Sequence, residues 1–135
     1  MATKVLDSWA LIAFLEDEPA AEQVEKLLEQ AAVDKHRLLL CVVNWGEIYY
    51  NTMREVSQDA AEQQARAIAT LPIEIVGVGD DLALARQAAI YKATHRMAYA
   101  DCFAAALAKA KNAELLTGDP EFKPLEKEIK IGWLK

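Results

Sequence analysis

Four carboxylic acids that lie far apart in the sequence occupy similar positions relative to the predicted strands. Asp7 ends the first strand, Glu47 lies one helical turn past the second, Asp101 is near the start of a buried helix, and Asp119 follows the next strand. Ligands of open parallel sheets bind outside the carboxyl ends of the strands, so we expect these acids to converge on one edge. Like charges held together cost free energy unless a cation lies between them. The pattern therefore predicts a cation site.

The side chains around these acids indicate which cation and which reaction to expect. Carboxylate oxygens, assisted by the hydroxyl and amide groups of Ser8, Asn44 and Thr117, are hard ligands that suit Mg²⁺ or Mn²⁺ rather than zinc or copper. One or two such ions can activate a water molecule and stabilise the charge on the leaving oxygen of a phosphodiester. The predicted chemistry is hydrolytic phosphoryl transfer.

Each acid also has a structural explanation, because acids are common at helix starts, where they accept hydrogen bonds from free backbone N–H groups. Asn44 and Glu47, for example, have the spacing of a capping box, and Asp119 stands before Pro120 as an N-cap would. Independent caps have no reason to gather at one sheet edge without a neighbouring arginine to neutralise them. Taken together, the four acids favour the cation site.

Strands alternate with helices along the chain that must position these acids. The predicted strands are residues 4–7, 37–43, 72–78, 113–116 and 129–134. In the first predicted helix Ser8 is the N-cap, and Asn44 opens the third. In the helix that carries Asp101, the apolar residues recur at helical spacing and predict one buried stripe. The alternation indicates a mainly parallel α/β sheet covered on both faces.

Composition limits the class of protein. With 135 residues, we expect a single domain spanning residues 1–135 that folds without disulfides. The net charge of -6 argues against binding nucleic acid by bulk electrostatics, but a nuclease that gathers carboxylates around divalent ions is acidic for that reason. The two cysteines, Cys41 and Cys102, lack the CxxC spacing of a zinc site. Because the apolar runs are too short to span a bilayer, we expect no membrane contact and a cytoplasmic location.

Basic residues precede the helix that carries Asp101. Arg96, together with His95 and Lys92, is placed to contact substrate phosphates, although a solvated charged turn explains these residues equally well. His95 is not needed as a general base if a metal ion activates the water. Cys102 has no paired histidine and is expected to be a small buried hydrophobe rather than a nucleophile.

Four segments of the sequence, taken in order, resemble the motifs of one known family. VLDSWALIAFL carries Asp7, VVNWGEIYY carries Glu47, MAYADCFAAALA carries Asp101, and LLTGDPEF carries Asp119. Together they resemble the PIN domain, and most closely the toxin members of VapBC-type toxin–antitoxin pairs. The resemblance covers nearly the whole chain. A haloacid-dehalogenase-like phosphatase fits less well, because it needs a second aspartate where Trp9 stands.

The resemblance implies a PIN-like three-layer α/β/α sandwich with a five-stranded, mainly parallel sheet. It also implies an endoribonuclease in which the four acids bind Mg²⁺ or Mn²⁺ and an activated water attacks RNA, with Ser8, Asn44 and Thr117 supporting the site by hydrogen bonding. The implied partners are RNA, a cognate antitoxin protein and a second copy of the chain in a homodimer. A housekeeping RNA-processing nuclease and a non-catalytic binding module with the same fold are the alternatives left open.

Overall fold

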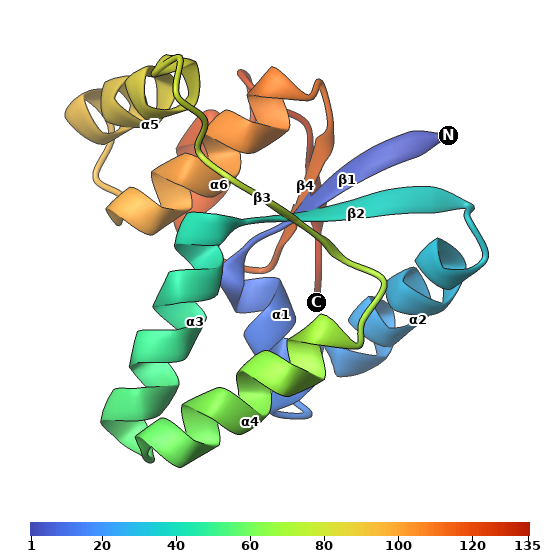
Figure 1. The fold of residues 1–135 in the computed structure, drawn as a ribbon. Helices are drawn as coiled ribbons and strands as arrows, with labels where there is room; N and C mark the ends of the chain where they lie inside the picture. Colours follow the sequence, from blue (N-terminus) through green and yellow to red (C-terminus); the bar gives the residue numbers. More distant parts are fainter.

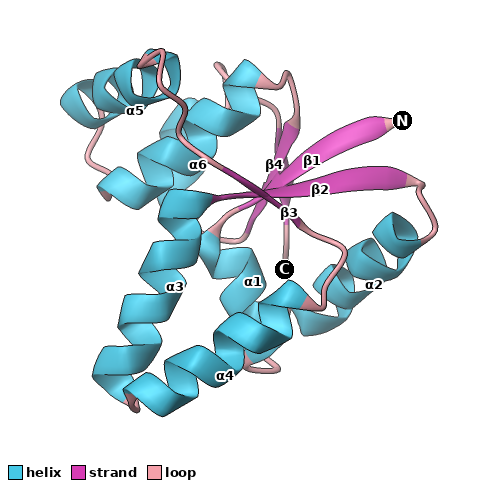
Figure 2. Ribbon diagram, viewed as in Figure 1, coloured by secondary structure: helices cyan, strands magenta, loops and turns pink.

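The computed structural model describes the whole chain, Met1–Lys135, as an alternation of strands and helices (Figures 1 and 2). The strands are β1 (Ala2–Leu6), β2 (His36–Cys41), β3 (Glu74–Val76), β4 (Glu114–Thr117) and β5 (Ile131–Trp133). The α-helices are α1 (Ser8–Leu15), α2 (Ala21–Ala32), α3 (Val42–Glu55), α4 (Gln58–Ala69), α5 (Ala83–Thr94) and α6 (Tyr99–Ala110), and a 3₁₀ helix, η1, covers Pro120–Leu125. None of the helices combines the length and apolar character that crossing a membrane requires.

The five strands form one sheet in the order β3-β2-β1-β4-β5, and every neighbouring pair is parallel. Strand β1 is at the centre. Its last residue, Leu6, is paired with Leu40 of β2 on one side and with Leu116 of β4 on the other. The carboxyl ends of the three central strands are therefore level, and the residues that follow them emerge at the same edge.

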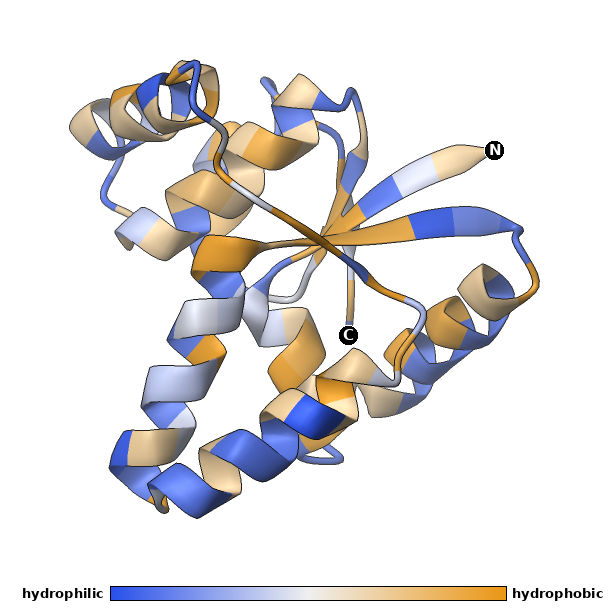
Figure 3. Cartoon of the chain, in the orientation of Figure 1, coloured by the Kyte–Doolittle hydropathy of each residue, from blue (hydrophilic) through white to orange (hydrophobic).

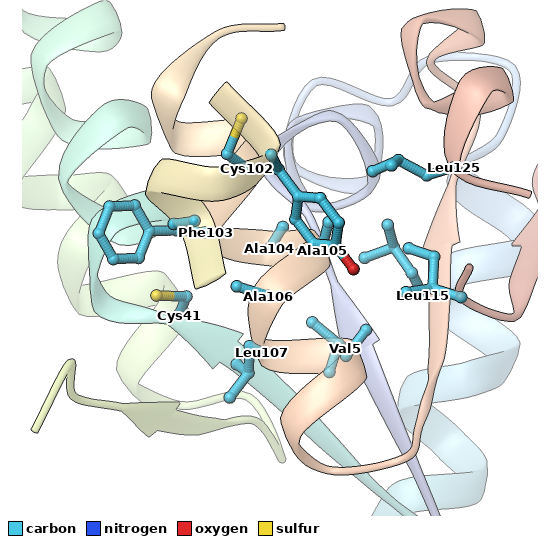
Figure 4. Close-up of a cluster of buried hydrophobic side chains, with 14 of the residues drawn as sticks. Val5, Cys41, Cys102, Phe103, Ala104, Ala105, Ala106, Leu107, Leu115 and Leu125 are labelled. Atoms are coloured by element: carbon cyan, nitrogen blue, oxygen red, sulfur yellow. The ribbon is translucent and has the colours of Figure 1, made fainter. Parts of the chain in front are cut away.

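Helices cover both faces of the sheet, so the architecture is the expected three-layer α/β/α sandwich (Figure 1). Side chains alternate along each strand: Val5 points to the face covered by α5, α6 and η1, whereas Leu6 points to the face covered by α1 to α4. The two apolar clusters lie on opposite faces, and part of the first is drawn in Figure 4. The sheet, predicted to be mainly parallel, is entirely parallel.

Helix α6 is buried on all sides along residues 101–108, a stretch dominated by alanine (Figures 3 and 4). Sequence periodicity predicts one buried stripe, and the structure corrects this because α5 packs along the side of α6 that would otherwise face water. Small alanine side chains allow the two helices to approach closely. A helix enclosed in this way holds Asp101, in its first turn, in a fixed position.

Two predicted helix starts are wrong by one or two residues. The N-cap of α1 is Asp7 rather than Ser8, because the Asp7 carboxylate accepts a hydrogen bond from the Ala10 N–H. Strand β2 ends at Cys41 and α3 begins at once with Val42, so Asn44 lies inside the first turn and does not open the helix. The strand prediction ran on to residue 43 because the apolar run continues across this boundary.

Candidate metal centre

Three carboxylates from two regions of the chain meet at the carboxyl edge of the sheet. Asp101 lies in the first turn of α6, Asp119 is the second residue after β4, and Glu121 lies in η1. Each offers one carboxylate oxygen, and these three oxygens lie within 4.8 Å of one another. Asp7 and Glu47 are close enough for their charges to act on Asp101 or its neighbours. The structure therefore groups Asp101 and Asp119 with Glu121, which the sequence did not single out, and it leaves Asp7 and Glu47 within electrostatic reach of this group.

Asp7 is the fully buried member of the group, with 0% of its surface exposed. One of its carboxylate oxygens accepts from the Ala10 N–H at 2.8 Å, and the other accepts from the Thr117 hydroxyl. The Thr117 oxygen in turn accepts from the backbone N–H of Asp119 at 3.0 Å. A single threonine thus joins the acid that follows β1 to the acid that follows β4.

Burial, with a smaller contribution from repulsion between the acids, raises the pKa values of Asp7 and Asp101. Burial is the main cause that raises the pKa of Asp7 to about 7, and repulsion from Asp101 and Asp119 adds to it, while the hydrogen bonds from Thr117 and Ala10 act in the opposite direction. Burial also raises the pKa of Asp101 to about 7, with repulsion from Glu47 and from the two acids beside it.

No basic side chain compensates this charge. The ion pairs of the protein join Lys4 to Glu114, Arg37 to Glu74 and His95 to Glu128, and none includes an acid of the site. Partly buried carboxylates without a counter-charge favour a cation, and oxygen-only donors favour a hard one such as Mg²⁺ or Mn²⁺. The donor set therefore fits the divalent ion that the sequence predicts.

Asn44 ties three elements together beside the acids. Its amide Nδ2, on α3, donates to the Ser8 hydroxyl of α1 at 3.2 Å and to the carbonyl oxygen of Ala100 in α6 at 3.1 Å. The Ser8 hydroxyl also donates to the Asn44 backbone oxygen at 3.4 Å. Asn44 therefore does not form the capping box with Glu47 that its spacing predicts. The N-cap of α3 is Cys41, and the Asn44 amide is used in the hydrogen bonds above. Its side-chain oxygen is buried without a hydrogen-bond partner.

The loop that carries Asp119 is held on both sides. Asp119 is the N-cap of η1 and accepts from the Glu121 N–H at 2.9 Å, so its predicted capping role and its place in the acid cluster coexist. The Trp9 ring packs against Gly118, where an added Cβ would come within 2.5 Å of the ring carbon Cζ2. Gly118 is thus needed for this close approach, which sequence reasoning missed because it depends on how α1 packs.

The remaining candidates lie outside the acid cluster. Arg96 is exposed between α5 and α6 and makes no hydrogen bond or ion pair. His95 contacts Thr94 and Glu128 instead of any acid of the site. Cys102 is fully buried in the apolar cluster of Figure 4, as expected of a small hydrophobe. Only Arg96 is free to meet a ligand from solution.

Comparison with known families decides what this fold is. The family model of the PIN domain matches residues 4–128. The chain belongs to the PIN domain family. The resemblance drawn from the four sequence motifs is thereby confirmed at the level of the family, and the matched region includes every acid of this PIN domain's candidate site. No curated protein sequence matches the chain.

Solved structures share the fold of this PIN domain along almost its full length. VapBC2 from Rickettsia felis, bound to a DNA fragment from its promoter, matches with a TM-score of 0.76 and 14% identity, covering 98% of this chain and 99% of that one. VapC20 from Mycobacterium tuberculosis, a Sarcin-Ricin loop cleaving toxin, matches with a TM-score of 0.69 and 16% identity over 90% and 93% of the two chains. At these identities the similarity establishes the fold.

Proposed function

We propose that this PIN domain is a metal-dependent endoribonuclease and the toxin of a type II toxin–antitoxin pair. The observation that carries the proposal is the cluster of uncompensated carboxylates at the carboxyl edge of the sheet. In this proposal Asp7, Glu47, Asp101 and Asp119 hold Mg²⁺ or Mn²⁺. When bound, the ion supplies a Lewis acid that activates water and neutralises charge on the phosphodiester.

The residues of the chain have distinct tasks in this proposal. Asp101 and Asp119 present oxygens to the ion from the rigid end of α6 and from the capped start of η1. Asp7 lies deepest and is oriented by Thr117, which also fixes the backbone at Asp119. Ser8 and Asn44 hold the starts of α1 and α6 at a constant separation. Preorganisation of this kind keeps the acids in place despite their mutual repulsion.

The RNA substrate must approach a protein of net charge -6, so attraction to phosphate depends on the bound ion and on local basic groups. Arg96 is the basic residue that we assign to this task, because it is exposed and free of ion pairs just before α6. Phosphate contacts of this kind position the substrate without reading its sequence.

The toxin assignment draws support from solved structures that share the fold, among them VapBC complexes and a VapC toxin that cleaves the Sarcin-Ricin loop. By analogy, we propose a cognate antitoxin protein as partner, a homodimer as the assembly and the cytoplasm as the location. Expression in cells separates the two kinds of nuclease. Growth arrest that a neighbouring antitoxin gene relieves would support the toxin assignment, whereas RNA cleavage without growth arrest would support a housekeeping nuclease.

The decisive experiment compares Asp101→Asn with the wild type on a mixed pool of tRNA, rRNA and mRNA, with Mg²⁺ or Mn²⁺ against EDTA. We expect discrete fragments that need the metal and a loss of about a hundredfold or more in the variant, because the ion loses a charged ligand. Asp80→Asn is the matched control. Asp80 is exposed in a loop, so this variant should cleave RNA like the wild type. Near-normal cleavage by Asp101→Asn, or cleavage in EDTA, would refute the proposal.

A further inference from the structure

Two tyrosines are the exposed aromatic side chains of the protein, and they differ in what lies over their rings. Tyr50 on α3 and Tyr99, the first residue of α6, are each 46% exposed. The guanidinium carbon of Arg54 lies over the Tyr50 ring, 4.9 Å from its centroid, whereas no cation lies over the Tyr99 ring. Single exposed aromatic residues are common on protein surfaces, so the surroundings of Tyr99 must decide whether it has a role.

The Tyr99 ring is held in place by the core beneath it. Its centroid lies 4.9 Å from that of Phe103, and the two ring planes are inclined at 60°. Phe103 is only 6% exposed and belongs to the apolar cluster between α6 and the sheet (Figure 4). Part of the Tyr99 ring therefore rests on the core, while the rest is open to solvent. A ring fixed before a ligand arrives loses less conformational entropy when it binds one.

The backbone on either side of Tyr99 is fixed as well. The Lys92 ammonium group donates to the carbonyl oxygen of Met97 at 2.7 Å, and the Asn44 amide donates to that of Ala100 at 3.1 Å. Met97 is itself buried, with 3% of its surface exposed. The segment between α5 and α6 thus presents Tyr99 in one position at the start of α6.

The first turn of α6 carries both Tyr99 and Asp101. Two such residues are about 3 Å apart along the helix axis and point to different sides of the helix, so the ring lies beside the acid cluster and not in it. Arg96, which is exposed and has no ion pair, precedes the same turn. A nucleic acid likewise carries charged phosphates and aromatic bases next to one another, so a nucleic acid strand can contact all three features at once.

We propose that Tyr99 is a stacking site for an unpaired base of the RNA, next to the phosphate that is cleaved. The inference rests on the proposed function and names a further substrate-binding residue for it. Stacking needs a base whose face is free, so the contact favours a single strand or a loop over a continuous double helix. Every base has such a face, so Tyr99 does not read the sequence.

The test measures the binding of a short labelled RNA oligonucleotide by fluorescence anisotropy, with the RNA either single-stranded or annealed to its complement. Ca²⁺ replaces Mg²⁺ in these titrations, because it also binds oxygen ligands. We expect Tyr99→Leu to weaken binding of the single strand about tenfold, and Tyr99→Phe, which keeps the ring, to bind like wild type. The duplex should bind more weakly than the single strand and should not respond to Tyr99→Leu.

Tyr50→Leu is the matched control, because it makes the same chemical change at an equally exposed tyrosine on another helix, and it should bind RNA like wild type. Cleavage with Mg²⁺ gives a second readout. Tyr99→Leu should raise KM for the single strand by a similar factor with little change in kcat, since stacking is the same in the ground state and in the transition state. Circular dichroism of each variant checks the fold.

The stacking site is refuted if Tyr99→Leu binds the single strand like wild type, or if wild type binds the duplex as tightly as the single strand. It is also refuted if Tyr99→Phe loses as much affinity as Tyr99→Leu, because the hydroxyl would then be the contact. A change confined to self-association, measured by sedimentation velocity, would place the ring in an interface between copies of the chain and exclude the stacking site.

These outcomes are distinct from those of the proposed function. If Tyr99→Leu binds RNA like wild type while Asp101→Asn loses cleavage, the stacking site falls and the nuclease stands. If RNA binding depends on Tyr99 but wild type cleaves nothing with Mg²⁺ or Mn²⁺, the stacking site stands and the nuclease falls.

Discussion

Replacing Asp7 by asparagine should stabilise the metal-free protein at neutral and alkaline pH. The pKa of Asp7 is raised from its ordinary value of 3.8 to about 7, chiefly by burial. Because the folded-state pKa is the higher one, the contribution of Asp7 to folding stability is greatest below pH 3.8 and is lost as the pH rises through 7. At pH 8 the complete difference applies, and it corresponds to about 4 kcal/mol. Between pH 5 and pH 8 the wild type should lose roughly 2–3 kcal/mol through Asp7.

Asparagine has the shape of aspartate but no charge, so it escapes this penalty. Its side-chain oxygen can still accept from the Ala10 N–H, whereas the hydrogen bond donated by the Thr117 hydroxyl is lost. That loss costs about 1–2 kcal/mol. We therefore expect a net stabilisation of about 2–3 kcal/mol at pH 8, which shrinks or changes sign at pH 5.

The assay is urea denaturation in EDTA at pH 5, 6, 7 and 8, with Asp80→Asn as the control for an exposed aspartate. Adding Mn²⁺ should reverse the order of stability, because the ion binds the folded wild type more tightly than the variant. The reasoning is refuted if Asp7→Asn is no more stable than wild type at pH 8 in EDTA, or if the difference between the two proteins does not change with pH.

Two further changes, Gly118→Ala and Thr117→Val, test how the loop after β4 is held, and a third, Gly46→Ala in α3, is a contrasting glycine replacement. Gly118→Ala should destabilise the protein by about 1–3 kcal/mol, because the new methyl group collides with the Trp9 ring; thermal denaturation measures this, and wild-type stability would contradict the contact. Gly46→Ala is the opposite case, because nothing lies within 4 Å of the added carbon. Alanine favours the helical conformation over glycine, so this variant should be more stable than the wild type by about 0.5–1 kcal/mol. Thr117→Val should cost roughly 1–3 kcal/mol and raise the pKa of Asp7 further, seen as a steeper loss of stability with pH; an unchanged profile would exclude the hydroxyl as the group that holds this pKa down.

The sequence predicted the parts of the site that depend on chain connectivity. Asp7 and Asp119 come within two residues of the ends of β1 and β4, and parallel strands deliver such residues to a common edge. Asp101 was predicted because its helix leads into β4. The alternation of strands and helices likewise predicted the three layers, because each parallel strand needs a crossover connection.

Features that depend on how separate elements pack were missed. Glu121 has no distinguishing pattern in the sequence, and it becomes part of the site only because η1 packs beside the start of α6. Asn44 was expected to support the site by hydrogen bonding, but its hydrogen-bond partners, the Ser8 hydroxyl and the Ala100 carbonyl oxygen, depend on the crossing of three helices and could not be predicted. The burial of α6 on all sides depends on the docking of α5, which no period in the α6 sequence records.

The hydrogen bond between Thr117 and Asp7 joins residues at opposite ends of the chain, 110 positions apart. A polypeptide emerging from the ribosome folds from its N-terminal end, and Asp7 and Glu47 are made long before their partners. The acids cannot assemble until β4 and η1 have been synthesised and have docked beside β1. Under the proposed function, an incomplete nascent chain is harmless to the RNA that encodes it, and the late position of β4 and η1 acts as a safeguard during translation.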